Sequence, residues 1–278
     1  MPLPILQSSH HNPTPADLIR YYVQTERDWT RHTSEETSLD VGTAFHNAQL
    51  NNVWDANNVI DAALPEGVSP AVAVAQVEEH FDSNGARCRR WNINLSAPPE
   101  RTRPLTEHLL SNGWRTLSCD IMHLSGSPPG TIREVGGLKI IPVRASYRHA
   151  RQIAEESSKR WNEPQLTESA LLHFEDPHFD ALLSLKDGEA VAMAGVLAVG
   201  EIGRIDEVFV SEKYRRLGIG RTMMSRVLEI CARSLFRHVL LSCLADNAPA
   251  IALYESIGFR KVGTITTYVI ANQADNER

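Results

Sequence analysis

The chain has 278 residues, of which 42% are hydrophobic and 22% charged, with a formal net charge of −6 at pH 7. This length exceeds one ordinary domain, so we expect two. The acidic balance argues against a general nucleic-acid-binding protein. The sequence has no apolar run of membrane-spanning length, and residues 1–17 lack the pattern of a signal peptide. We therefore expect a cytoplasmic protein with no nucleic-acid or membrane partner.

The cysteines indicate a reduced protein without a bound metal. Cys88, Cys119, Cys231 and Cys243 follow no metal-ligand spacing. Lone thiols within apolar runs are usually small buried side chains. No metal site is predicted.

The first half predicts a domain over residues 17–125, after a disordered N-terminal segment over residues 1–16. Its clearest elements are a strand at 87–95, a helix at 101–111 and a strand at 117–124. The helix and the last strand are joined by Ser-Asn-Gly-Trp. Residues 126–137 have a linker composition rich in serine, glycine and proline.

A second domain is predicted over residues 138–271, followed by a tail at 272–278. Its first helix covers 146–159, and a second covers 167–173, with Thr167 as its N-cap. Strands are predicted at 138–143, at 179–185 and 189–199 around an Asp-Gly turn, and at 205–210. Including the later segments, the element order is β-α-α-β-β-β-α-β-α-β-β.

A glycine-containing turn between the strand at 205–210 and a helix at 222–235 predicts an anion site. It reads Arg215-Arg216-Leu217-Gly218-Ile219-Gly220-Arg221. The first turn of a helix presents unpaired N–H groups at the positive end of its dipole, which favours a phosphate. The glycines allow close approach, and the arginines add positive charge. The turn is neither a P-loop nor a three-glycine dinucleotide fingerprint.

The residues beyond this helix carry a family resemblance. A strand at 239–244 precedes Asn247, Ala250, Leu253-Tyr254 and Gly258-Phe259. Together with Arg215, Gly218 and Gly220, they resemble the two signatures of the GNAT superfamily of acyl-CoA-dependent N-acyltransferases. The resemblance covers roughly residues 137–270.

The first half repeats part of this pattern without its chemistry. Ser256-Ile-Gly-Phe259 leads into a strand at 262–270, as Ser111-Asn-Gly-Trp114 leads into the strand at 117–124. We interpret this as an internal repeat. Leu109 stands where the second half has Tyr254, and the first half has no anion turn. An unrelated α+β domain whose glycine ends a helix is the alternative.

The predicted fold class is therefore α/β (α+β), with two GNAT-like domains, each a mixed central β-sheet flanked by helices. The first is a degenerate domain without a cofactor motif, and the second is catalytic. The first domain is expected to wall the acceptor site or to replace a dimer partner.

The resemblance implies that acetyl-CoA is the co-substrate. The backbone of Val208, Phe209 and Val210 would pair with its pantetheine amides. The pyrophosphate would lie on the N–H groups of the turn, with Arg215 or Arg216 close to the phosphates; the turn residues are Arg216, Leu217, Gly218, Ile219, Gly220 and Arg221. Asn247 would hydrogen-bond the cofactor, or instead cap the following helix.

The resemblance also implies direct transfer of the acetyl group to a primary amine in a ternary complex. Tyr254 would protonate the CoA thiolate, because a phenol is protonated at pH 7; a role as a core aromatic is compatible with this. Glu207 is the predicted general base, with Asp206 and ordered water as alternatives. Strand alternation predicts that these two carboxylates point to opposite faces.

The acceptor is predicted only as a small-molecule or peptide amine, and the protein as a monomer or homodimer. The loop at 160–164 would shape the acceptor site, with Trp161 in its wall or covering the core. A protein that binds acyl-CoA without catalysis, as a sensor or regulator, is the hypothesis of a different class.

Overall fold

The computed structural model describes residues 12–125 and 135–270. The expected tail, most of the linker and most of the expected N-terminal segment lie outside the described residues. The helix α1 begins at Pro15, inside the segment that was expected to be disordered. Thr14 explains this start, because its side chain accepts from the Asp17 N–H and Asp17 accepts from the Thr14 N–H in a capping box.

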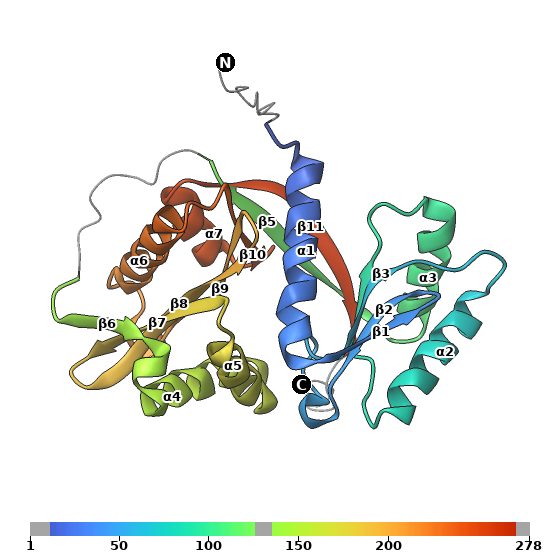
Figure 1. The fold of residues 1–278 in the computed structure, drawn as a ribbon, viewed down its shortest axis with the longest axis horizontal. Helices are drawn as coiled ribbons and strands as arrows, with labels where there is room; N and C mark the ends of the chain where they lie inside the picture. The colour runs from blue at the N-terminus through green and yellow to red at the C-terminus, as the bar shows by residue number, and fades with distance from the viewer. Residues whose placement is uncertain (1–11, 126–134, 271–278) are drawn as a thin grey trace, which may run out of the picture.

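The described residues form one mixed sheet of eleven strands, in the order β1-β2-β3-β4-β11-β5-β10-β9-β8-β7-β6 (Figure 1). The strands are β1 Glu35–Leu39, β2 Gly42–His46, β3 Asn58–Ala62, β4 Arg90–Ile93, β5 Arg115–Leu124, β6 Leu138–Pro142, β7 Phe179–Lys186, β8 Glu189–Val199, β9 Ile202–Val210, β10 His238–Leu244 and β11 Phe259–Val269. The mixed α/β class predicted from the sequence is confirmed.

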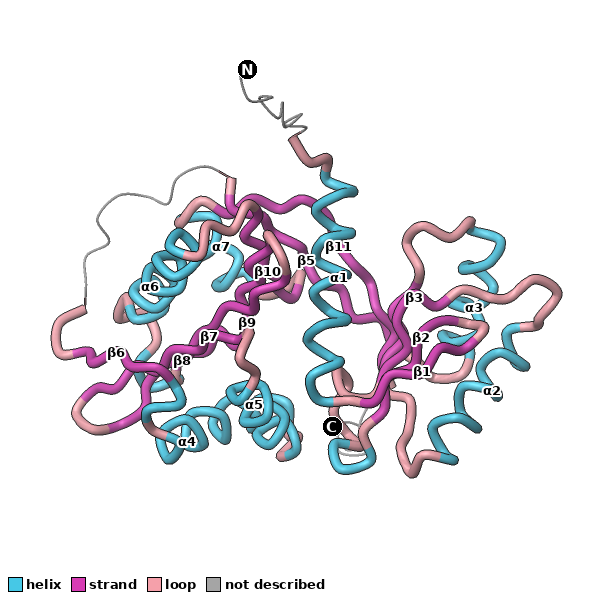
Figure 2. Tube along the Cα trace, in the orientation of Figure 1, coloured by secondary structure: helices cyan, strands magenta, loops and turns pink. Residues whose placement is uncertain are grey.

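Helices cover both faces of the sheet, as the tube in Figure 2 shows. In the C-terminal half, α6 and α7 lie on one face and α4 and α5 on the other. The helix α1 stands beside the middle of the sheet and contacts β5, β8, β9, β11 and α5. The bounds are α1 Pro15–Thr33, α2 Pro70–Ser83, α3 Pro99–Ser111, α4 Tyr147–Ser158, α5 Gln165–Glu175, α6 Ile219–Arg233 and α7 Ala248–Ser256.

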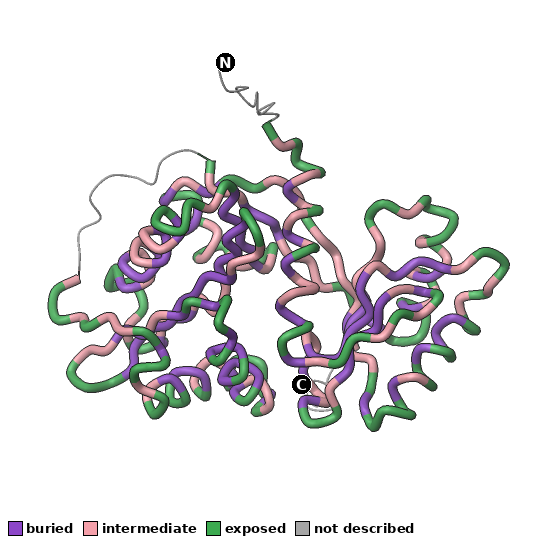
Figure 3. Tube along the Cα trace, in the orientation of Figure 1, coloured by how far each residue is buried: buried purple, intermediate pink, exposed green. Residues whose placement is uncertain are grey.

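Apolar periodicity explains why the core forms where it does. Along α6 the buried side chains recur three or four residues apart, which turns one stripe toward the sheet; they are Ile219, Met223, Met224, Val227, Leu228 and Cys231. The strands beneath are buried almost throughout (Figure 3). None of the helices within residues 12–125 and 135–270 is both long and apolar enough to cross a bilayer.

Two details of the sequence-based elements are wrong. The helix α5 begins at Gln165, so Thr167 lies inside it, where its buried hydroxyl bonds to Ser158 Oγ at 2.9 Å. Two final strands were expected, but residues 135–270 contain only β11 after α7. The strand β5 of the first half occupies the sheet position beside β10 instead.

The two halves exchange their last strands. The strand β5 pairs antiparallel with β10 of the second half, and β11 pairs antiparallel with β4 of the first half. β5 and β11 pair with each other along ten residues of β5, from Arg115 to Leu124. The sheet therefore runs without a break from one half to the other.

The sheet is also symmetric about the β5–β11 pair. In both halves a run of antiparallel pairings, two in the first half and three in the second, leads to one parallel pairing, β3 with β4 and β9 with β10. β3 and β9 each contain an acidic residue with positive φ, Asp61 at 58° and Glu207 at 55°. A non-glycine residue rarely adopts this conformation. Its occurrence at the same place in two strands supports the interpretation of an internal repeat.

The two parallel pairs differ beyond these positions. In the second half the pairing of β9 with β10 ends at Ile205↔Leu241, directly before Asp206 and Glu207. In the first half pairing resumes past Asp61, at Ala62↔Ile93. The strands therefore part in the second half and close together in the first.

Candidate functional site

The predicted anion turn has the geometry of an anion-binding loop. Arg216 and Gly218 both have positive φ, 64° and 86°, which turns successive N–H groups toward one side. Gly218 is the N-cap of α6, and the Thr222 N–H is bonded to its carbonyl at 3.1 Å. The N–H groups of Ile219, Gly220 and Arg221 occupy the first turn, where a helix offers no carbonyl partner. The turn therefore presents a group of backbone N–H donors at the start of α6.

The arginine side chains surround this turn. Arg215 is exposed, and its Nε donates to the Val210 carbonyl at 3.2 Å, so that it bridges the end of β9. Arg216 is exposed, as is Leu217. Arg221 donates to Ser256 Oγ on α7 at 2.6 Å, which places it between the two helices. The local charge is positive, as an anion requires.

At the end of β9, one backbone edge pairs with no other strand of residues 12–125 and 135–270. Val210 and Phe209 pair with Ala192 and Met193 of β8 on one side. On the other side, the pairing with β10 has already ended at Ile205. Backbone groups from Val208 to Val210 can therefore bond to the amides of an extended ligand, although the Val210 carbonyl already accepts one bond from Arg215. The Phe209 side chain is buried in the core against α4 and α5, so its contribution is limited to the backbone.

Tyr254 lies on the α6–α7 side of the sheet, in the core cluster that contains Cys243. Its ring is 6% exposed and meets Phe259 edge-on at 6.2 Å between centroids. Burial, followed by the charges of Cys243 and Asp206, raises the pKa of Tyr254 above the ordinary value. The hydroxyl is thus kept protonated next to the gap between β9 and β10.

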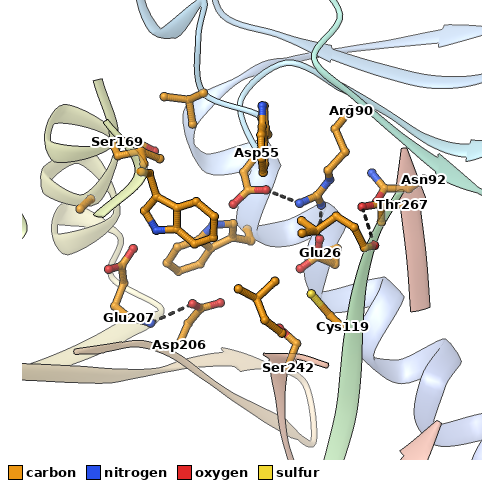
Figure 4. A pocket seen from close by; sticks show the side chains of 18 of the residues that line it. Glu26, Asp55, Arg90, Asn92, Cys119, Ser169, Asp206, Glu207, Ser242 and Thr267 are labelled. Atoms are coloured by element: carbon orange, nitrogen blue, oxygen red, sulfur yellow. Dashed lines mark hydrogen bonds and ion pairs between the residues drawn. The ribbon is translucent and has the colours of Figure 1, made fainter. Parts of the chain in front are cut away.

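A cavity of about 690 Å³ lies on the other side of the gap, between the two halves. Its walls come from α1, the loop before β3, β4 and β5 in the first half, and from α4, α5, β8, β9 and β10 in the second. Figure 4 shows its carboxylates, among them Asp55, Asp206 and Glu207. The first half therefore contributes directly to the walls of this cavity.

The prediction that Asp206 and Glu207 point to opposite faces is wrong. Both line the cavity. The pairing of β8 with β9 shifts between Met193 and Gly195, and Glu207 takes positive φ. Such a bulge inserts one extra residue and cancels the alternation of neighbouring side chains. The Glu207 N–H then donates to Asp206 Oδ1 at 2.8 Å.

Glu207 is the carboxyl with the most perturbed acidity around the cavity. Burial raises its pKa to about 8, with further contributions from the negative charges of Asp206 and Asp55. A carboxylate with a pKa in this range is a much stronger base than an ordinary glutamate. Its position and basicity suit proton transfer with an amine.

Charged groups of alternating sign join the two halves along the cavity. Arg204 of β9 pairs with Glu26 of α1 at 2.7 Å and with Asp206 at 2.5 Å. Arg90 of β4 pairs with Glu26 and with Asp55. The series Asp55–Arg90–Glu26–Arg204–Asp206 therefore contains three acids and two bases.

Aromatic side chains from both halves complete the walls. Trp29 stacks on His173 at 3.5 Å between ring centroids, and Arg204 lies over the Trp29 ring at 5.3 Å. Burial lowers the pKa of His173 well below its ordinary value, so the ring is neutral. Trp161, which the sequence left open, is 42% exposed, lines the cavity and meets Trp54 edge-on at 6.1 Å.

Asn247 caps a helix, which is one of the two roles that the sequence predicted for it. Its Oδ1 accepts from the Ala250 N–H at 3.3 Å at the start of α7. The amide nitrogen is a donor and is the group through which Asn247 would contact a ligand. The described residues contain no group of three His, Cys, Asp or Glu side chains placed to hold a metal ion.

The sequence suggested that the first half could wall the acceptor site, but it identified none of the residues that line the cavity from that half. Glu26, Arg90 and Asp55 belong to no motif, and their proximity arises only from the tertiary structure. One signal was present: Arg204 and Asp206 are two residues apart in an apolar strand, and buried charges in such a position usually have partners.

Comparison with known proteins places the second half in a family. Residues 147–259 match the model of the acetyltransferase (GNAT) family. The mycothiol acetyltransferase of Acidothermus cellulolyticus is 34% identical over 111 residues, and the N-alpha-acetyltransferase RimI of Mycobacterium tuberculosis is 29% identical over 103 residues. These matches cover 34% and 36% of this chain, and 34% and 63% of the relatives, so the chain spans less than two thirds of either relative.

Solved structures share the fold along most of the chain. A GCN5-related N-acetyltransferase from Kribbella flavida has a TM-score of 0.61 at 16% identity, covering 92% of this chain and 97% of its own. A tandem GNAT protein from the clavulanic acid biosynthesis pathway has a TM-score of 0.52 at 13% identity, covering 81% of both chains. At this identity the likeness concerns the fold.

Proposed function

Because residues 147–259 match the model of the acetyltransferase (GNAT) family, we propose that the chain transfers an acetyl group from acetyl-CoA to a primary amine bound in the cavity between its halves. One observation carries this proposal. A buried tyrosine and a basic glutamate lie on opposite faces of the sheet, at the gap where β9 and β10 part. The predicted co-substrate and its acceptor would then meet through this gap.

The residues present fit acetyl-CoA. The anion turn supplies the N–H groups of Ile219, Gly220 and Arg221 and the side chains of Arg215 and Arg216 for the phosphates. The free edge from Val208 to Val210 matches the amides of pantetheine. Bound acetyl-CoA supplies its acetyl group as a thioester, which exchanges the CoA thiol for an amine.

Two side chains of this protein would move protons. Glu207 accepts a proton from the acceptor ammonium on the cavity side, which frees the nitrogen lone pair for attack. Tyr254 donates its hydroxyl proton to the departing sulfur on the α6–α7 side. The ammonium nitrogen loses two protons in all, one to Glu207 before the attack and one after it. The second offsets the proton that Tyr254 gives to the sulfur, and the first is released to solvent. The new amide bond replaces the thioester bond. Asp206 and Asp55 favour an ammonium over a neutral or anionic acceptor.

We further propose that the chain consists of two fused GNAT-type units, 17–125 and 138–271, of which only the second binds the co-substrate. The sheet symmetry and the paired bulges at Asp61 and Glu207 support this. In the first half the strands close at Ala62↔Ile93, and Leu109 stands in the place of Tyr254. The first unit would serve as the wall of the acceptor site.

The test is release of free CoA thiol from acetyl-CoA with a panel of amines. We would include peptides with an N-terminal alanine, spermidine and cysteamine derivatives with a blocked thiol. Turnover with at least one amine, identified as the N-acetyl product by mass spectrometry, is expected. Tight CoA binding without turnover above hydrolysis would instead favour the acyl-CoA sensor.

A further inference from the structure

The alternating charges between the halves have a distinctive arrangement of exposure. Their two ends are accessible from the cavity, because the Asp55 side chain is 43% and the Asp206 side chain 28% exposed. The three groups between them, Arg90, Glu26 and Arg204, are 11%, 15% and 5% exposed. Glu26 is therefore a buried anion held between two arginines, one from each half.

Hydrogen bonds fix Glu26 in this position. The Tyr22 hydroxyl, one helical turn earlier on α1, donates to Glu26 Oε1 at 2.9 Å. The same hydroxyl is bonded to Ser242 Oγ of β10 at 2.8 Å. The side chain of Glu26 thus links α1 to β4, β9 and, through Tyr22, β10.

Arg204 pairs with two carboxylates, Glu26 of the first half and Asp206 of its own strand. Its Nη1 faces Glu26 Oε1 at 2.7 Å, and its Nη2 donates to Asp206 Oδ2 at 2.5 Å. The other oxygen of Asp206 accepts from the Glu207 N–H at 2.8 Å. A guanidinium held by Glu26 therefore orients Asp206, and Asp206 holds the backbone of the bulge that turns Glu207 into the cavity.

We propose that Glu26 is a positioning residue for acetyl transfer, supplied by the N-terminal helix, which acts on Glu207 through Arg204 and Asp206. This inference rests on the proposed function with Glu207 as the base. It gives the first half a role in the chemistry beyond enclosing the acceptor, although that half has no cofactor motif.

The charge of Glu26 acts on Glu207 through Arg204, because Glu26 compensates the positive charge that favours an ionised Glu207. The charged groups that act most on Glu207 are Asp206 and Arg204 of its own strand and Asp55 of the first half. Other titratable groups around the cavity come from α1, β3, β4, β5, the segment between α4 and α5, α5 and β10: Tyr22, Asp61, Arg90, Arg115, Cys119, Lys159, Arg160, Glu163, His173 and Cys243. Without the negative charge of Glu26, Arg204 and Arg90 would be less compensated, and an ionised Glu207 would be favoured.

The experiment compares Glu26→Gln with the wild type, using the panel amine that turns over fastest. The pH profile of kcat/KM, the plateau kcat and the Kd of CoA are measured. We expect the midpoint to move toward acid by about one pH unit, because Arg204 without its Glu26 partner would favour an ionised Glu207 more strongly. We also expect the plateau kcat to fall about tenfold, the cost typical of a misoriented catalytic group, with the CoA Kd unchanged.

Glu36→Gln is the matched control, because Glu36 also pairs with two arginines but lies outside the cavity lining. It should leave the midpoint and the plateau unchanged. A purely structural role for Glu26 would lower activity without moving the midpoint, and that result overturns the proposal. An unaltered profile with unaltered kcat overturns it as well.

A second variant covers the possibility that Glu26→Gln does not fold. Glu26→Asp keeps the charge but withdraws the carboxylate by one methylene, so the midpoint should stay and the plateau should fall; an unchanged plateau overturns the proposal. Failure of the proposed function looks different. In that case the wild type releases no CoA with any amine, or Glu207→Gln retains full activity, and the role of Glu26 falls with it.

Discussion

Burial is the main reason that the pKa values of Glu207 and Tyr254 are raised, and each raised pKa suits the proposed role. Glu207 lies on a bulge beside Asp206, where burial and neighbouring carboxylates favour its protonated form. Tyr254 is enclosed by apolar side chains, and burial keeps its proton in place. The base is therefore strengthened, and the acid stays protonated across the physiological pH range.

We expect kcat/KM to rise with pH to a midpoint near 8. The pKa of Glu207 is raised to about 8, so below that pH the group is protonated and cannot accept the proton of the amine. Activity should then fall about tenfold per pH unit on the acid side. Glu207→Gln should lose at least about 100-fold in kcat and show no such limb. A midpoint near the ordinary glutamate value would contradict this role.

Stability should depend on the same group. The folded pKa of Glu207 is raised above its ordinary value of 4.5, so its contribution is present below pH 4.5 and is lost as the pH rises toward 8. The stability of the wild type relative to Glu207→Gln should therefore decrease between these pH values. Urea unfolding of both proteins across this range measures the difference, and parallel curves would refute it.

The variant Tyr254→Phe tests the proposed role of Tyr254 as the general acid. The ring and its packing against Phe259 are kept, so the fold should survive with a loss of no more than about 1 kcal/mol. Without the hydroxyl proton, kcat should fall about 100-fold while the CoA Kd stays constant. Tyr268→Phe is the control, since Tyr268 packs in the core of the first half. Equal activity of Tyr254→Phe and the wild type would exclude the acid role.

At the scale of elements, the junction of β9 and α6 combines backbone strain with the proposed phosphate site. Arg216 adopts φ of 64° although it is not glycine, which costs free energy that Gly218 avoids at its own φ of 86°. An arginine at such a position supplies charge at the expense of stability. This is the pattern expected where a loop is shaped for a ligand.

The variant Arg216→Gly should therefore separate the effect of backbone strain on stability from the effect of the arginine charge on CoA binding. We expect the protein to gain up to about 1 kcal/mol in unfolding free energy, because glycine adopts positive φ without penalty. The CoA Kd, measured by calorimetry, should rise several-fold with the lost charge. Leu235→Gly is the matched control: Leu235 also has positive φ, 56°, but is 86% exposed beyond the end of α6. It should gain stability with no change in CoA binding.

The comparison of β3 with β9 explains why one bulge opens a gap and the other does not. Past Asp61 the chain bonds back to its neighbours: the Asn94 N–H donates to the Ala62 carbonyl at 3.0 Å, and Leu64 and Arg101 bond to each other. These bonds close the first half at the place where the second half is open. The closed strands support the proposal that only the second half binds the co-substrate.

At the scale of the whole molecule, strand exchange makes the halves interdependent. The strand β5 is the neighbour of β10, and β11 that of β4, so each half completes the sheet of the other. Separating the halves would expose strand edges and remove one wall of the acceptor cavity. Both halves are therefore needed to form the cavity.

A protease site inserted between residues 125 and 135 tests whether the two halves depend on each other. After cleavage we expect the two fragments to remain together on gel filtration without denaturant and to keep their activity. The fragment from residue 135 onward, expressed alone, should lack cooperative unfolding and should regain activity when coexpressed with residues 1–125. An isolated second half with full activity would contradict the interdependence and the role of Glu26.

Much of the second half could be predicted from local patterns. Apolar periodicity placed α4, α6 and the β7–β8 hairpin within a few residues of their bounds, because one stripe or face of each is buried. The anion turn was predicted from Gly218, Gly220 and the arginines. Bulges and helix starts were harder: the bulge at Glu207 depends on the pairing with β8, and the start of α5 does not depend on a side-chain cap.

The sequence by itself determined the fold class, the anion turn and the family resemblance, because those features depend on residues close together in the chain. Only the tertiary structure decided that Asp206 and Glu207 share one cavity and that Glu26, Arg90 and Asp55 join them. The tertiary structure also decided that β5 pairs with β10 of the second half and β11 with β4 of the first half. These are long-range contacts. A buried charge pairs with a group that is close to it in space, and the spacing of residues along the chain does not predict which group that is.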